Sequence, residues 1–198
     1  MVDVFAGAFN GDVNEIGKKN HINSFFTGFA CGLPEDDARD FELSGGLSYL
    51  SNMADSNGLS EANDTDGDGA PDGVTDLIGG VSAHMSLEYK DTVLFKAEYV
   101  GALNDFKAGE LAFAPEGDTV RPAAWATEIS FAGPSQVGFG FKYEGTNDCG
   151  GFLPETGYGS TVFCHPFECA RLGLEYQYQE YANNDMNQGV TTQLAVEF

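Results

Sequence analysis

Side-chain character alternates with a period of two along most of the chain, and this pattern constrains the fold more than any other feature. In DLIGGVSAHMSLEY, for example, Leu77, Val81 and Leu87 fall on one side, and Ser82 and Glu88 fall on the other. Successive side chains point to opposite faces in a β-strand, whereas a helix repeats its apolar residues at 3.6-residue spacing. The pattern recurs in TVLFKAEYVGAL, AAWATEISF, VGFGFKYEG, ARLGLEYQY, FELSGGLSY and VTTQLAVEF, and it predicts an all-β protein.

The connections between these stretches alternate between long and short. Tight turns are expected at YKD, GPS and HPFE, a medium one at NNDMNQ, and long loops at residues 10–21, 52–76, 104–122 and 147–156. Long extracellular loops, short periplasmic turns and aromatic girdles at both interfaces are typical of outer-membrane barrels. Aromatic residues stand at strand ends on the apolar side, at Phe41, Tyr49, Tyr89, Phe131, Tyr143 and Phe198.

The sequence therefore predicts an antiparallel transmembrane β-barrel of about ten strands in the outer membrane of a Gram-negative cell. One domain is expected over residues 1–198, with a long acidic extracellular loop at 52–76 and both termini on the periplasmic side. Because alternation begins directly after Met1, the chain is expected to lack its N-terminal part. A soluble secreted β-sandwich is the alternative fold, with loops of equal length at both ends.

Charge and aromatic content exclude two other classes. The chain carries 31 acidic and 9 basic residues, for a net charge of -22. A phosphate backbone is bound by clusters of Lys and Arg, so nucleic acid is not an expected partner. With 16 phenylalanines and 8 tyrosines the chain is also too aromatic for a disordered polyanion.

The charged residues of the strands share the polar face of the predicted barrel. In a closed lumen such groups must pair or meet water. They could form a packed plug of ion pairs, or they could line a weakly cation-favouring channel, which their excess of carboxylates favours. The predicted lumen-lining residues are Glu42, His84, Glu88, Lys96, Glu98, Glu128, Lys142, Glu144, Arg171 and Glu175.

The longest loop contains NDTDGDGAPDGVTD, in which carboxylates alternate and a glycine allows a tight turn. This spacing resembles the first half of an EF-hand loop and the calcium repeats of thrombospondin type 3. Thr75 stands at the twelfth position, where an EF-hand has a bidentate Glu, so weak Ca²⁺ binding is expected, with a solvated acidic loop as the alternative. The predicted ligands are Asp64, Asp66, Asp68, Asp72 and Asp76.

The remaining reactive residues give no catalytic arrangement, and we expect the protein not to be an enzyme. His84 lies near Ser82 and Ser86, but no acid or oxyanion element accompanies them. Cys164 and Cys169 flank the predicted HPFE turn, and the sequence is consistent either with a disulfide between them or with two free thiols. Cys31 and Cys149 are expected on opposite rims, too far apart for a disulfide.

The chain ends on GVTTQLAVEF, an alternating strand that finishes on an aromatic residue. Such an ending resembles the signal by which the barrel-assembly machinery recognises its outer-membrane substrates. The residues that carry it are Val190, Thr192, Leu194, Val196 and Phe198. An ordinary edge strand that ends on Phe is the alternative.

Several segments together resemble the C-terminal portion of the LbtU-type siderophore porin family. They are AFNGDVNEIGKKNHINSF, SYLSNMADSNGL, AEYVGALNDFKAGEL, PAAWATEISF, LPETGYGSTV and TTQLAVEF, in this order along nearly the whole chain. The resemblance implies uptake of iron-siderophore complexes through the lumen and carries over no site residues. Because ~16 strands enclose an aqueous channel and ~8 are filled by side chains, about ten strands imply part of a larger barrel or a narrow one without that transport.

The predicted function is therefore an outer-membrane porin or transporter for siderophores or other small solutes. The expected partners are outer-membrane lipid, the barrel-assembly machinery and the solute. A structural or adhesive barrel with calcium-binding extracellular loops is the alternative.

Overall fold

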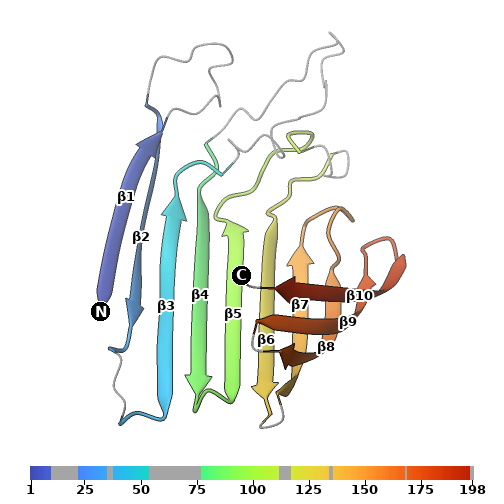
Figure 1. Ribbon diagram of the computed structural model, residues 1–198. Coiled ribbons are helices and arrows are strands. Elements are labelled where there is room, and N and C mark those ends of the chain that lie inside the picture. Colours follow the sequence, from blue (N-terminus) through green and yellow to red (C-terminus); the bar gives the residue numbers. More distant parts are fainter. Residues whose placement is uncertain are drawn as a thin grey trace.

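The computed structural model describes residues 1–9, 22–34, 38–53, 77–111, 117–133, 136–167 and 169–196. These residues form a single antiparallel sheet of ten strands, each paired with the strand that follows it (Figure 1). No helix in this part of the chain has the length and apolar character needed to cross a membrane. The strands are β1 (Val2–Phe9), β2 (Ser24–Gly32), β3 (Phe41–Leu50), β4 (Gly80–Tyr89), β5 (Val93–Ala102), β6 (Ala123–Ala132), β7 (Val137–Asn147), β8 (Thr156–Phe167), β9 (Ala170–Glu180) and β10 (Met186–Val196).

The prediction of an all-β chain with about ten antiparallel strands is confirmed. The alternative of a β-sandwich is wrong for the described residues, because they form one sheet with no second sheet packed on it. The short turns lie at one rim, which we call the short-turn rim, and the long connections lie at the other, the long-connection rim (Figure 1). This is the meander of an up-and-down barrel wall.

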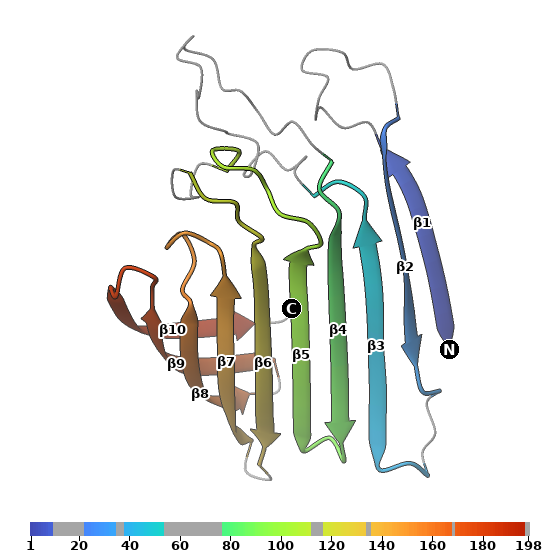
Figure 2. The same cartoon turned by 180° about the vertical axis from the view of Figure 1, so that it is seen from behind.

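The sheet curls strongly but remains open. Parts of β8 to β10 pass in front of β6 and β7 in Figure 1 and behind them in Figure 2. Within the described residues, β1 pairs only with β2 and β10 pairs only with β9. The ten strands therefore form a curved wall with two free edges.

The C-terminal hairpins differ from the prediction. The segment expected as the HPFE turn continues β8 through Phe167, and the register shifts between Cys164 and Phe167. Pro166 has no N–H to donate, and a bulge is the usual way for a strand to accept a proline. Likewise, β10 begins at Met186, inside the segment predicted as a loop, because Asn187 and Gln188 place polar side chains on both faces and give no alternation.

The two faces of the sheet differ in chemistry. We call the face that carries Glu98 the inner face and the face that carries Tyr99 the outer face. Large apolar side chains of the outer face are widely exposed, with Leu47 at 47% and Phe141 at 54% of their maximum. Contiguous apolar surface of this extent is rare on soluble monomers and marks contact with lipid or a partner.

Aromatic residues of the outer face gather at two levels. Near the short-turn rim, Phe41 pairs with Tyr89, Tyr89 with Val93, Val93 with Phe131, and Phe131 with Phe139. Toward the other rim, the Trp125 and Tyr143 rings meet edge to face with centroids 4.7 Å apart, and Tyr143 stacks on Tyr158 at 4.9 Å. Of the aromatic residues predicted at strand ends, Phe41, Tyr89, Phe131 and Tyr143 lie in these two groups. Tyr49 contacts Phe25 with ring centroids 5.7 Å apart, and Phe198 falls outside the described residues.

A small buried cluster lies at the long-connection rim and was not predicted. Phe106 and Leu111 are fully buried, and they pack with Ile78, Ala102 and Val120. The Phe106 and Val120 backbones exchange two hydrogen bonds of 2.8 and 3.2 Å, so the β5–β6 connection folds back on itself. These contacts fix the connection against the inner side of the wall.

Candidate functional site

The ten predicted lumen residues all lie on the inner face. The pairing registers place His84 opposite Glu98, and Glu128 between Lys96 and Lys142. Alternation along each strand and pairing between strands place the other five residues on the same face: Glu42, Glu88, Glu144, Arg171 and Glu175. That this face lines a water-filled lumen stays a prediction.

Sequence reasoning missed one charge of this face. Asp3 pairs with Ala30, Ala30 pairs with Gly46, and Gly46 pairs with His84. Paired residues share a face, so Asp3 lies on the inner face with His84. The signal was present in the alternation of VDVFAGAF, the first strand, which was not assigned face by face. Asp3 adds a seventh carboxylate to the six predicted, against the three cations Lys96, Lys142 and Arg171.

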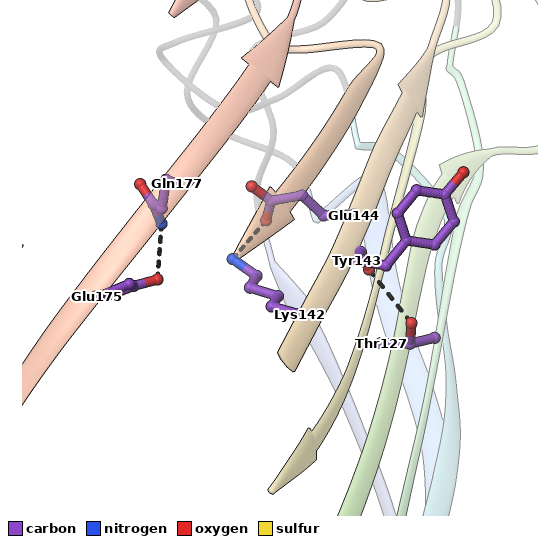
Figure 3. A network of polar contacts seen from close by, with 6 residues as sticks. All are labelled: Thr127, Lys142, Tyr143, Glu144, Glu175 and Gln177. Carbon is purple, nitrogen blue, oxygen red and sulfur yellow. Dashed lines mark hydrogen bonds and ion pairs between the residues drawn. The ribbon is translucent and has the colours of Figure 1, made fainter. Parts of the chain in front are cut away.

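Most charges of the inner face are open to solvent. Glu98, Glu128 and Lys96 are exposed, as are Glu42, His84 and Arg171. Within the described residues, a single ion pair joins members of the set, that of Lys142 with Glu144 (Figure 3). Such sparse pairing favours a hydrated wall over a packed plug of ion pairs.

Polar contacts on β7 and β9 show how alternation separates the faces. Figure 3 shows Lys142 and Glu144 on one side of β7 and the ring of Tyr143 on the other. Across the inner face, the Gln177 side-chain amide donates to the Glu175 carboxylate at 2.9 Å. One strand thus presents charge to the inner side and an aromatic ring to the outer side.

Glycines allow two large inner side chains to lie flat on the wall. A Cβ added to Gly46 on β3 would lie 2.6 Å from Cε1 of His84, so the imidazole leans from β4 toward β3. A Cβ added to Gly157 on β8 would lie 2.8 Å from Cγ of Glu144, so this side chain leans from β7 toward β8. The strip of wall between them is left uncovered.

A cavity of about 520 Å³, which we call the wall pocket, occupies this strip. Its lining includes Val100, Ala124 and Ala126, which we call its floor, and Leu153 and Pro154 from the β7–β8 connection. Because its lining extends from β4 to β9, the inner face is the concave one. The polar residues of its lining include His84, Glu98, Glu144 and Gln179.

Hydrogen bonds hold the connection that contributes Leu153 and Pro154 to the wall pocket. The hydroxyl of Thr146 donates to the carbonyl oxygen of Pro154 at 2.9 Å, and its backbone N–H donates to that of Glu155 at 3.2 Å. Thr146 is itself buried, with 9% of its surface exposed. Two hydrogen bonds therefore tie this connection to the end of β7.

A second cavity, of about 350 Å³, lies at the long-connection rim and shares Thr146 and Leu153 with the wall pocket. Asp118, Asp148 and Glu155 are among its lining residues. The backbone N–H of Arg121 donates to the Asp148 carboxylate at 3.1 Å. Carboxylates therefore line both adjoining cavities, the one at the long-connection rim and the one on the inner face.

The four cysteines are free thiols. Cys164 points to the outer face opposite Leu172, and Cys169 lies exposed at the turn before β9. Cys31 is near the short-turn rim and Cys149 is in the opposite rim, as expected. Burial raises the pKa of the Cys149 thiol above its ordinary value.

Two predicted sites fall wholly or partly outside the described residues. The calcium ligands Asp64, Asp66, Asp68, Asp72 and Asp76 all lie in the segment 54–76, which the structure does not describe. Among the described residues, no group of three or more His, Cys, Asp or Glu side chains is placed to hold a metal ion. Of the predicted assembly signal, Val190, Thr192, Leu194 and Val196 share the outer face of β10, and Phe198 is not described.

The fold and its two faces define an all-β protein whose antiparallel meander is that of a barrel wall. No family model matches the chain. Its sequence is 27% identical over 187 residues to the UPF0422 protein of Coxiella burnetii, covering 91% of this chain and 38% of that relative. The chain thus spans less than two fifths of the relative's length. A NanC porin structure is similar with a TM-score of 0.44 and 11% identity, over all of both chains.

Proposed function

We propose that this chain forms the wall of an outer-membrane channel for small solutes. The observation that carries the proposal is the contrast between the faces. Apolar side chains such as Leu47, Phe141 and Leu174 are exposed on the outer face between two levels of aromatic residues. A lipid-facing band bounded by aromatic girdles and a polar interior are the properties of membrane-spanning barrels.

The charge of the inner face supports a preference for cations. The inner face carries seven carboxylates and three cationic side chains. The exposed carboxylates among them are free to interact with passing ions. Rings of Asp and Glu select cations because they lower the electrostatic energy of a positive ion in the pore. The carboxylates of the rim cavity extend this field toward the solution.

A membrane channel requires that the two free edges be paired, because lipid offers no hydrogen-bond partners. Ten alternating strands leave β1 and β10 running in opposite directions, which suits antiparallel closure. Direct pairing of β1 with β10 would leave a passage suited to ions and very small solutes, since about eight strands are already filled by side chains. A wider passage needs further strands in the wall.

Iron-siderophore complexes are the narrower solute class that we propose, on the resemblance to siderophore porins. Outer-membrane lipid and the barrel-assembly machinery are the proposed partners, supported by the apolar outer face of β10. Weak Ca²⁺ binding by loop 64–76 is proposed from its sequence. Liposomes that contain the protein should take up a ferric siderophore faster than empty ones, and equal rates would restrict the proposal to smaller solutes.

The test of the channel is single-channel recording from the purified chain folded into a planar bilayer under a KCl gradient. We expect a reversal potential of the sign given by K⁺ selectivity. Glu128→Lys on the inner face should lower the K⁺/Cl⁻ permeability ratio. Glu180→Lys, on the outer face of β9, is the matched control and should leave the ratio unchanged. Folded, inserted protein without current would contradict the proposal.

A further inference from the structure

We propose that the wall pocket binds small organic cations that carry an apolar body. This inference rests on the proposed channel, because it takes the inner face as the side that solutes visit. A pocket of about 520 Å³ has the size of a small-molecule site. Its floor of Val100, Ala124 and Ala126 is apolar, and Glu98 stands at its edge.

Glycines opposite the flanking residues create the opening. His84 would cover the floor if it stood upright, but it lies across Gly46 on the neighbouring strand. Glu144 would narrow the pocket from the other side, but it lies across Gly157. Both side chains lean away from the floor, so the pocket follows from two cross-strand pairs of a glycine with a larger residue.

The β7–β8 connection adds apolar surface to the lining of the pocket. Leu153 and Pro154 line the pocket, and the two hydrogen bonds from Thr146 hold their connection in place. Val100 is 49% exposed in this lining, so the pocket offers apolar surface to a ligand. A ligand with an apolar group gains by covering this surface, since removing apolar area from water is favourable.

Glu98 supplies the charge preference. It makes no hydrogen bond or ion pair with the described residues, although His84 lies directly opposite on β4. Glu144, in contrast, is paired with Lys142. One unpaired carboxylate beside an apolar floor suits a single organic ammonium group, whereas hard metal ions take six or more oxygen ligands.

The test is calorimetric titration of the full chain, folded in detergent micelles, with three probes of similar size. They are benzyltrimethylammonium, benzyl alcohol and benzoate. We expect the cation to bind most tightly and benzoate most weakly. Glu98→Gln should weaken the affinity for the cation about fivefold, which is the change expected from the loss of one exposed ion pair. The affinity for the cation should then be close to that for the alcohol.

Two further variants separate the pocket from charge alone. Ala126→Leu fills the floor and should abolish binding of both the cation and the alcohol. Glu88→Gln removes a carboxylate of the same face that lies outside the pocket lining, and it should leave all three affinities unchanged. Equal affinity for the three probes, or equal losses in Glu98→Gln and Glu88→Gln, would overturn the inference.

The titration and the bilayer recording can fail independently. A chain that conducts K⁺ but binds the three probes equally keeps the channel and loses the pocket. A chain that binds the cation through Glu98 but passes no current keeps the pocket and loses the channel.

Discussion

Replacing adjacent residues of β5 with arginine tests the assignment of the two faces. Phe95 points to the outer face between Leu87 and Ile129, inside the band bounded by the aromatic levels. Leu94 points to the inner face directly opposite Glu88. Both are half-buried and apolar, so the two substitutions differ mainly in the face that receives the charge.

The expected costs follow from that difference. An arginine on the lipid face near the bilayer midplane costs about 2–4 kcal/mol in barrels of this kind. Phe95→Arg should therefore lower the folding equilibrium constant by roughly two orders of magnitude, at 1.4 kcal/mol for each factor of ten. Leu94→Arg gains a cross-strand partner in Glu88, worth roughly 0.2–1 kcal/mol, and should change stability by less than about 1 kcal/mol.

The measurement is equilibrium unfolding by urea in vesicles of a short-chain phosphatidylcholine. The chain has one tryptophan, Trp125, which lies on the outer face in contact with Tyr143. Its fluorescence therefore reports the loss of lipid contact directly. If Leu94→Arg costs as much as Phe95→Arg, or more, the assignment of lipid and water to the two faces is wrong.

Three smaller predictions concern single positions. Gly145→Ala should destabilise the sheet by about 1–3 kcal/mol, because the added Cβ would lie 2.6 Å from the Trp125 ring. Gly140→Ala meets nothing closer than 3.7 Å and is the control, and equal losses in urea unfolding would argue against this packing. Asp91→Gly should stabilise by about 0.5–1 kcal/mol, since φ is 51° there, and a lower unfolding midpoint would contradict it. Cys149, kept as the sole cysteine, should react with iodoacetamide with an apparent pKa above that of a free cysteine, because the thiol is partly buried. Because its folded-state pKa is raised, its contribution to stability is present below the unfolded-state pKa and is lost as the pH rises through the folded-state value. An alkylation pKa equal to or below that of the same thiol in the urea-unfolded chain would contradict this.

The strict alternation of side chains along each strand made much of the site predictable from the sequence. Because side chains alternate strictly along a strand, assigning Glu98 to one face also assigned Lys96 to that face and Tyr99 to the other. The pattern weakened where both faces carry polar residues, as at Asn187 and Gln188. There the contrast that defines a strand is missing, and the start of β10 was placed too late.

The alternation within each strand, the excess of carboxylates and the aromatic strand ends are properties of single segments, so the sequence by itself determined the all-β class and the members of each face. The tertiary structure decided which residues are neighbours across strands, because register depends on how the whole ladder pairs. Only that register brings His84 over Gly46 and Glu144 over Gly157, and so opens the wall pocket. It also decided the burial of Phe106, which depends on distant partners such as Ile78 that no local pattern identifies.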